Sequence, residues 1–201
     1  MSGKWIVAVL AVAAASGVVQ WGLVQGEDVK TANPVVLMET SEGPIKIELF
    51  ADKAPITVKN FLQYVDEKFY DGTVFHRVID GFMIQGGGMT PDLKEKPNHA
   101  PIKNEASAEV PNERGTLAMA RTNVVDSATS QFFVNVVNNA ALNHKDNTQR
   151  GFGYCVFGKV IEGMDTVDKI KKVETKTTGQ YENVPVKPVI IKSVTRVEEK
   201  K

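Results

Sequence analysis

The first periodic pattern in the chain is an alternation of apolar and charged residues, which is typical of a strand with one buried face. It is clearest in residues 45–50, where Lys46 and Glu48 separate the apolar positions. Residues 35–40 form a second strand-like run, and residues 41–44 between the two runs include a glycine and a proline. We therefore predict a β-hairpin over residues 35–50 with a four-residue turn.

A helical spacing follows the hairpin. Pro55 is suited to a first helical turn, because its fixed φ matches the helix and its missing N–H is not needed there. Apolar residues then recur every three or four positions, which predicts a helix with one buried face that ends at residues 71–72. The same spacing predicts a second helix over residues 164–171. The apolar face of the first helix consists of Val58, Phe61, Leu62, Val65 and Phe69.

Most of the remaining chain consists of short apolar runs that glycines and polar residues separate. Several short strands with only two helices predict a mainly β protein, built as a closed barrel or a sandwich and not as a parallel α/β sheet. The predicted strands are residues 74–79, 82–85, 116–119, 131–137, 154–160 and 188–197.

The N-terminal segment differs from the rest, since residues 5–26 contain no charged side chain. Of the 20 residues 5–24, 16 are apolar, and Lys4 supplies the only side-chain charge before them. A positive start, an apolar centre and small residues are typical of a secretory signal peptide. About 20 apolar residues also suffice to cross a bilayer as an N-terminal hydrophobic helix. A buried core helix is disfavoured, because only a larger protein could cover it on all sides.

This segment sets the domain organisation that we expect. Residues 1–26 are a cleaved signal peptide or an uncleaved membrane anchor, and residues 27–34 are a linker. Residues 35–197 form one globular domain, and residues 198–201 are a charged tail. Both interpretations of the leader place the domain outside the cytoplasm, with membrane contact only through residues 5–24 if they are retained.

Composition excludes several classes of function. The 24 basic residues equal the 24 acidic ones, which argues against a nucleic-acid partner. The single cysteine, Cys155, excludes an intrachain disulfide, and its apolar neighbours favour a small buried side chain over a reactive thiol. His76, His99 and His144 are far apart without metal-ligand spacing, so we expect no metal. The glycines 86–88 lack the Lys-Ser/Thr that would make them a phosphate loop.

An arginine in an apolar strand is the first candidate for chemistry. If residues 74–79 form a strand, Arg77 points to the same face as Phe75 and Ile79. A guanidinium on an apolar face is costly unless it is paired or belongs to a site, although it can also reach solvent at a barrel rim. A strand over residues 131–137 would also place Phe132 and Phe133 on opposite faces. One ring could then fill the core while the other lines a surface pocket, unless both are core residues.

Three motifs in these regions together resemble one protein family. They are F-H-R-V-I-x-G-F-M-I-Q-G-G from Phe75, A-M-A-R-T-x(7)-S-Q-F-F from Ala118, and V-F-G-K-V from Val156. The sequence from residue 35 to residue 197 is similar to cyclophilin-type peptidyl-prolyl cis-trans isomerases, and most similar to their bacterial, periplasmic branch. This resemblance implies a closed eight-stranded antiparallel β-barrel capped by two α-helices, and catalysis without any cofactor.

The resemblance also implies a role for each matching residue. Arg77 would be catalytic and donate a hydrogen bond to the prolyl nitrogen of the twisted amide, while Gln85 would orient Arg77 and the substrate backbone. The substrates would be proline-containing unfolded or flexible polypeptides, and a noncatalytic proline-binding or holdase module is the alternative. The implied substrate-binding residues are His76, Phe82, Met83, Ala120, Arg121, Phe133, Leu142 and Tyr154.

Two positions depart from the family pattern. Ala141 stands where many members have a tryptophan, and Tyr154 stands where many have a histidine. Since alanine removes an aromatic wall and an indole N–H, we expect weak binding of cyclosporin-like macrocycles. The resemblance further implies a monomer in the bacterial periplasm, either soluble after cleavage or anchored to the inner membrane by residues 5–24.

Overall fold

The computed structural model describes residues 33–198 of the chain. The predicted hydrophobic helix within residues 1–26, most of the linker and most of the charged tail therefore lie outside the described residues. Within residues 33–198, no helix is both long and apolar enough to cross a membrane.

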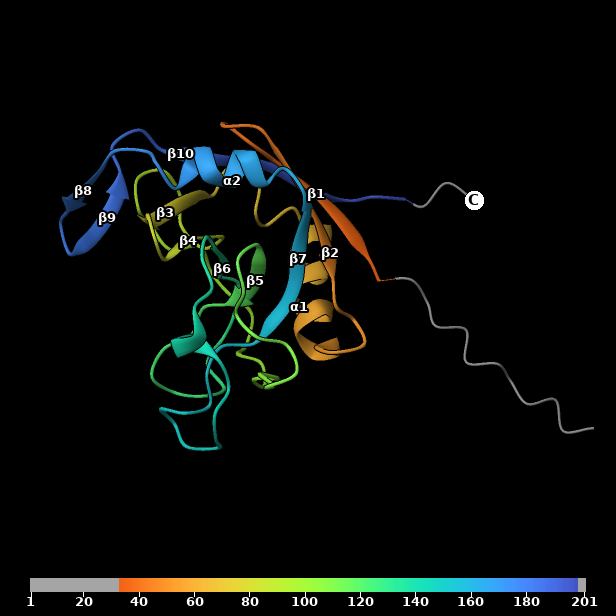
Figure 1. Cartoon of the computed structure of the whole chain (residues 1–201). Helices are drawn as coiled ribbons and strands as arrows, with labels where there is room; N and C mark the ends of the chain where they lie inside the picture. The colour runs from red at the N-terminus through yellow and green to blue at the C-terminus, as the bar shows by residue number, and fades with distance from the viewer. Residues whose placement is uncertain (1–32, 199–201) are drawn as a thin grey trace, which may run out of the picture. The chain divides into compact units, whose positions relative to one another are not determined.

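The described residues form a closed antiparallel β-barrel, as the sequence predicts. Eight strands close it in the order β1-β10-β3-β4-β6-β5-β7-β2 (Figure 1). The predicted hairpin is the pair β1–β2, in which Glu39 lies opposite Pro44. The barrel strands are β1 (Val35–Thr40), β2 (Pro44–Leu49), β3 (Val74–Ile79), β4 (Met83–Gly86), β5 (Thr116–Met119), β6 (Phe132–Asn135), β7 (Val156–Glu162) and β10 (Val189–Arg196).

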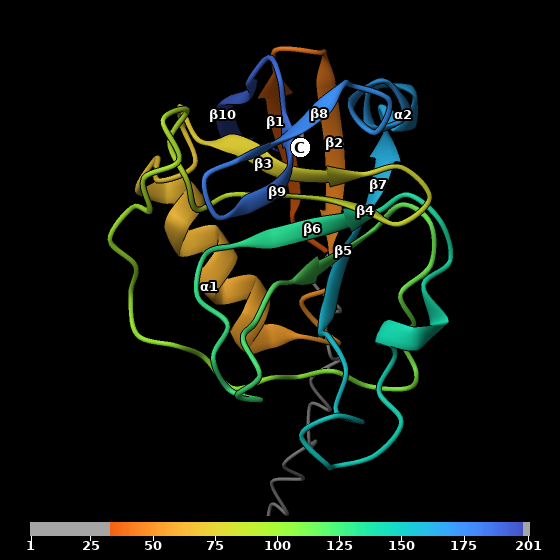
Figure 2. The ribbon, with the colours of Figure 1, turned by 90° about the vertical axis from the view of Figure 1, so that its left-hand side faces the viewer.

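Two α-helices pack on different sides of the barrel (Figure 2). They are α1 (Pro55–Asp66), which begins at the predicted proline, and α2 (Met164–Ile170). Helix α1 ends earlier than the predicted residues 71–72. Lys68 adopts a left-handed φ of 54°, its N–H donates to the Val65 carbonyl, and the Phe69 N–H donates to the Tyr64 carbonyl. These two bonds close the last turn as a Schellman motif, so Phe69 packs on the core from a turn and not from the helix.

The adjacent phenylalanines of β6 face opposite sides, as the strand pattern predicts. Phe132 has no exposed surface and lies in the main core with Phe61 and Tyr70, which both pack edge-on or nearly edge-on against it. Phe133 belongs to a smaller apolar cluster with Met83. One ring therefore fills the barrel and its neighbour lines the outer wall.

Strand β3 departs from simple alternation at His76. Phe75 lies opposite Gly86 and Arg77 lies opposite Gln85, so His76 is an extra residue and forms a β-bulge. Phe75 therefore packs in the core, whereas Arg77 faces the outer wall. The prediction that Arg77 shares a face with Phe75 is wrong, because the bulge reverses the alternation between them. Ile79, two residues further on, does pack on the outer cluster.

Two further elements were not predicted from the sequence. Strands β8 (Thr175–Thr178) and β9 (Tyr181–Pro185) form a separate two-stranded hairpin that lies beside β3 (Figure 1). The 3-10 turn η1 (Ala140–Leu142) precedes the long loop that leads to β7. Residues 175–185 are mostly polar and contain no apolar run of the kind that predicts the barrel strands, which explains why the hairpin escapes prediction.

Replacing Phe132 tests whether this ring of β6 packs in the core while Phe133 lines the outer wall. We expect Phe132→Ala to lower the free energy of unfolding by about 3–5 kcal/mol, because it leaves a cavity among the other aromatic rings. Urea denaturation measures this change. Val124→Ala, at a side chain that is 60% exposed, is the control and should cost less than about 0.5 kcal/mol. Equal effects of the two variants would contradict the assignment of Phe132 to the core.

Candidate functional site

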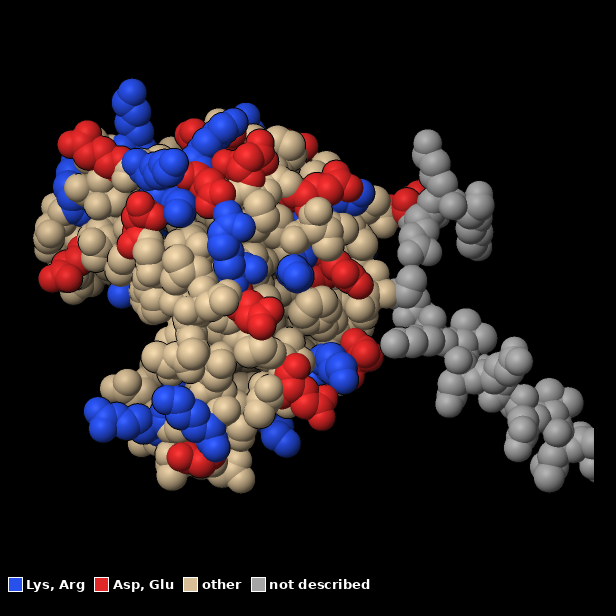
Figure 3. Space-filling view, viewed as in Figure 1, with Lys and Arg blue, Asp and Glu red and all other residues tan. Residues whose placement is uncertain are grey.

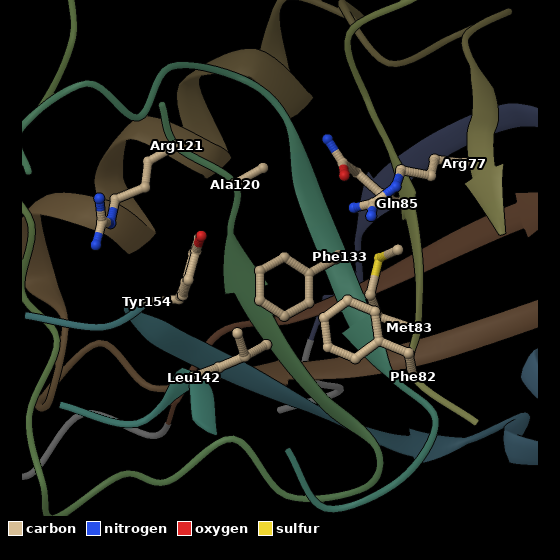
Figure 4. A pocket seen from close by; sticks show the side chains of 9 residues that line it. All are labelled: Arg77, Phe82, Met83, Gln85, Ala120, Arg121, Phe133, Leu142 and Tyr154. Atoms are coloured by element: carbon tan, nitrogen blue, oxygen red, sulfur yellow. The ribbon is translucent and has the colours of Figure 1, made fainter. Parts of the chain in front are cut away.

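A pocket of about 120 Å³ opens on the outer wall of the barrel (Figure 4). It contains nine of the ten residues that the sequence predicts for the site, and only His76 is missing. The side chains come from β3, β4 and the turn between them, from β6, from the residues after β5, from η1 and from the segment before β7. The lining residues are Arg77, Phe82, Met83, Gln85, Ala120, Arg121, Phe133, Leu142 and Tyr154.

The centre of the pocket is apolar and already formed. Met83 and Phe133 are almost fully buried and pack on the smaller apolar cluster, against which Phe82 and Leu142 also lie. The rings of Phe133 and Tyr154 meet edge to face with centroids 5.7 Å apart. A small apolar ring of a ligand could enter without moving these side chains, and a pocket of this size would bury most of that ring.

Arg77 and Gln85 lie on one side of this apolar centre, and Arg121 lies on the other (Figure 4). In the described part of the chain, no carboxylate lies within ion-pair distance of the Arg77 guanidinium. The donors of Arg77 are therefore free to face a ligand. The Gln85 side-chain amide donates to Gln131 Oε1 at 3.0 Å, and its role in orienting Arg77 and the substrate stays a prediction.

Arg121 has a different environment and a different role. Its Nε donates to the Gly153 carbonyl at 2.9 Å, and its two terminal nitrogens donate to the carbonyls of Thr122 and Gln149. Its guanidinium carbon also lies 4.8 Å from the centre of the Tyr154 ring. Arg121 thus fastens the loop before β7 to the pocket wall while it lines the pocket itself.

A buried amide network, which the sequence analysis missed, holds the walls together. Asn139 donates to the Phe82 carbonyl at 2.8 Å and to Asn135 Oδ1 at 2.7 Å. Asn135 in turn donates to Asn112 Oδ1, and Asn112 donates to the carbonyl of Leu142 at 3.1 Å. The only sequence signal was Asn135 within an apolar strand, where a buried amide needs partners.

His76 lies outside the pocket, in a separate cavity of about 150 Å³ between β3 and the β8–β9 hairpin. Its side chain is 5% exposed, and its Nδ1 has no hydrogen-bond partner among the described residues. Burial lowers the pKa of His76 from 6.5 to about 4, and the charge of Arg77 adds to this effect while the backbone of Val74 opposes it. His76 is therefore neutral at neutral pH, and the structure does not bring it into contact with the pocket.

Cys155 is buried, as its apolar neighbours predict. Burial raises the pKa of its thiol to about 11, so the reactive thiolate is scarce at neutral pH. Its sulfur lies 3.5 Å from the Thr57 hydroxyl, and the residue packs in the main core and does not line the pocket. Within residues 33–198, no group of three or more acidic, histidine or cysteine side chains is placed to hold a metal ion.

These features define a class of protein before any comparison is made. A closed β-barrel carries a preformed apolar pocket on its outer wall, with an unpaired guanidinium at one side and polar side chains around it. Such a surface suits a polypeptide segment that inserts one small apolar ring and lies along the wall with its backbone.

Comparison with known proteins gives the family. The family described as cyclophilin type peptidyl-prolyl cis-trans isomerase/CLD matches residues 35–196. Peptidyl-prolyl cis-trans isomerase B of Escherichia coli is 56% identical over 161 residues, covering 80% of this chain and 98% of that protein. A peptidyl-prolyl cis-trans isomerase of Acinetobacter baylyi is 59% identical over 163 residues, covering 81% of this chain and 85% of that protein. The chain therefore belongs to the cyclophilin family and is a peptidyl-prolyl cis-trans isomerase.

Solved structures agree with this assignment. A cyclophilin type isomerase of Cryptosporidium parvum has a TM-score of 0.69 and 27% identity, covering 84% of this chain and 99% of that one. The same protein, crystallised in the presence of the dipeptide Ala-Pro, has a TM-score of 0.68 over 82% of this chain and 99% of that one.

The buried neutral His76 should make stability depend on pH. Its pKa is lower in the folded chain than in the unfolded chain, so its contribution is complete above pH 6.5 and is lost as the pH falls to about 4. The expected loss is on the order of 3 kcal/mol, measured as the free energy of unfolding in urea at several pH values. His76→Gln should flatten this dependence, whereas His144→Gln should leave it in place. An unchanged slope in His76→Gln would exclude this role.

Proposed function

We propose that this isomerase lowers the barrier to rotation about X–Pro bonds through Arg77. The carrying observation is that the Arg77 guanidinium lines the apolar pocket with no carboxylate at ion-pair distance among the described residues. Its donors are available to a substrate atom that sits over the pocket.

Catalysis of this rotation requires a hydrogen-bond donor close to the prolyl nitrogen. An amide resists rotation with a barrier of about 18–20 kcal/mol, because resonance gives the C–N bond partial double-bond character. In the twisted amide this resonance is lost and the prolyl nitrogen regains its lone pair. A guanidinium that donates to this nitrogen stabilises the twisted state more than the planar one, and only such a difference accelerates the step. Arginine suits this task because it stays charged and its donors form a rigid fork.

The apolar residues would hold the proline ring in place during the rotation. We propose that Phe82, Met83, Phe133 and Leu142 hold the proline ring and exclude water while the preceding residue rotates. Since Gln85 donates through Nε2 to Gln131, its Oε1 remains free to accept an N–H from the substrate backbone. Ala120 also lines the pocket and would contact the substrate backbone. Tyr154 closes the pocket edge-on against Phe133.

We propose that the substrates are proline-containing segments of unfolded or flexible polypeptides. The family activity and the neighbouring structure solved in the presence of Ala-Pro support this class. We further propose that cyclosporin-like macrocycles bind weakly, because the exposed Ala141 beside Leu142 offers no aromatic wall. The working form would be a monomer that uses no cofactor.

We also propose that this isomerase acts on exported proteins. The support is the uncharged apolar run over residues 5–24, which follows Lys4. X–Pro isomerisation takes tens to hundreds of seconds without catalysis and can limit folding, so an exported isomerase would assist chains that fold after translocation. The enzyme would work in the bacterial periplasm, either as a soluble protein or anchored to the inner membrane by residues 5–24.

Removal of the guanidinium tests the mechanism. We expect Arg77→Ala to lower kcat/KM by on the order of 10²- to 10³-fold, the scale for the loss of one preorganised donor. A protease-coupled assay or NMR exchange on an Ala-Pro peptide measures this loss. Peptide affinity should change much less, because the apolar pocket remains. Arg114→Ala is the control, since Arg114 pairs with Asp168 outside the pocket. Unchanged turnover in Arg77→Ala would overturn the proposed role.

The mature N-terminus tests the proposed export. Mass spectrometry of the protein from fractionated bacterial cells should find it in the periplasm without residues 1–26, or in the inner membrane with them. Recovery of the full-length chain in the cytoplasmic fraction would contradict export. A variant with Val9 and Leu10 changed to Lys should remain in the cytoplasm, because the charges interrupt the apolar run.

A further inference from the structure

A second pocket adjoins the first at Arg121 and Tyr154, two residues that lie on the side of the first pocket away from Arg77 (Figure 4). It has a volume of about 330 Å³ and shares Arg121 and Tyr154 with the apolar pocket. Its other lining residues are Asn123, Gln149 and Arg150. Because two side chains line both pockets, a polypeptide that is held at the first can reach the second within a few residues.

The lining of this second pocket is rich in hydrogen-bond donors and contains no carboxylate. Two guanidiniums, two side-chain amides and a phenol face it. Asp146 is the acidic residue of the same loop, and its Oδ1 accepts from the backbone N–H and the hydroxyl of Thr148. In the described part of the chain, neither Arg121 nor Arg150 has a carboxylate within ion-pair distance.

The donors of this pocket are only partly used by the protein. Arg121 donates three of its five N–H groups to the carbonyls of Gly153, Thr122 and Gln149. Gln149 is fixed by its donation to the Asn123 carbonyl at 2.7 Å. The exposed guanidinium of Arg150 makes no hydrogen bond to other described residues, so it can turn toward a ligand.

Positive charge is local to this region and does not extend over the whole surface. Acidic and basic side chains are interspersed over the barrel, and the lobe below it carries several basic residues with an acidic one among them (Figure 3). The chain as a whole is neutral, so long-range attraction of anions is weak. Recognition of an anion at this pocket would therefore depend on direct contact.

We propose that this donor-lined pocket binds a carboxylate of the polypeptide substrate within about three residues of its proline. A carboxylate matches the guanidinium fork better than a neutral amide does, since it accepts two parallel hydrogen bonds. Arg150 is the specificity-determining residue, because Arg121 is already committed to holding the loop. This inference rests on the proposed binding of proline-containing polypeptides.

The source of the carboxylate is an Asp or Glu side chain in the substrate, since the isomerase must act within long chains. A free C-terminal carboxylate has the same chemistry, so the test peptides carry an amidated C-terminus in one series and a free one in another. Each series compares Glu with Gln at each of the three positions before and the three positions after the proline.

The test measures kcat/KM for these peptide pairs by NMR exchange at low and at high salt. At one or two positions we expect Glu to be preferred over Gln by about three- to fivefold at low salt in the amidated series, the scale of a partly exposed ion pair. Added salt should reduce the preference. In Arg150→Gln the ratio should fall to about one, while kcat/KM for the Gln peptides stays unchanged.

A matched variant separates this site from general electrostatics. Lys145→Gln removes the same charge from the same loop outside the pocket and should leave the Glu preference intact. A ratio near one at every position in the unmodified enzyme would overturn the proposal, and so would a preference that survives Arg150→Gln. A preference seen only with free C-termini would overturn the Asp or Glu source. If the unmodified enzyme turned over neither the Glu nor the Gln peptides, that result would instead count against the isomerase function.

Discussion

The β-bulge at His76 is the constraint on which the site depends. The barrel interior is closed and filled by aromatic and aliphatic side chains, so an unpaired guanidinium there would carry a large desolvation cost. One extra residue in β3 lets Phe75 stay inside and turns Arg77 to the outer wall. The same irregularity places His76 between β3 and the β8–β9 hairpin, where it is buried and neutral. One extra residue therefore lets the same strand contribute one side chain to the core and another to the pocket.

The pocket walls come from segments far apart in the sequence, and buried amides hold them in place. The chain of hydrogen bonds from Phe82 through Asn139, Asn135 and Asn112 to Leu142 joins the turn before β4 to η1 across the end of β6. Each amide is almost fully buried, so loss of the Asn139 side chain, for example, would remove the donor that the buried Asn135 Oδ1 accepts from. Such a network favours one arrangement of the walls, which allows the apolar pocket to exist before a ligand arrives.

Two arginines of the pocket illustrate how environment decides the use of one side chain. Arg121 gives most of its donors to backbone carbonyls and lies over Tyr154, so it stabilises a loop. Arg77 has no carboxylate partner among the described residues, so its donors are available to a ligand in the pocket. The two guanidiniums lie on opposite sides of the apolar centre, so the two roles proposed above, catalysis and substrate selection, would be separated in space (Figure 4).

The sequence by itself determined the elements whose pattern is local. Alternation and short apolar runs predicted the barrel strands, Pro55 marked the start of α1, and the motifs identified nine residues that meet in the pocket. Tertiary structure decided what depends on distant partners. These features are the bulge at His76, the early end of α1 at Lys68 and the bond of Gln85 to Gln131. The physical reason is that periodicity reports which face of an element is buried, whereas strand register and side-chain pairing are set by residues far away along the chain.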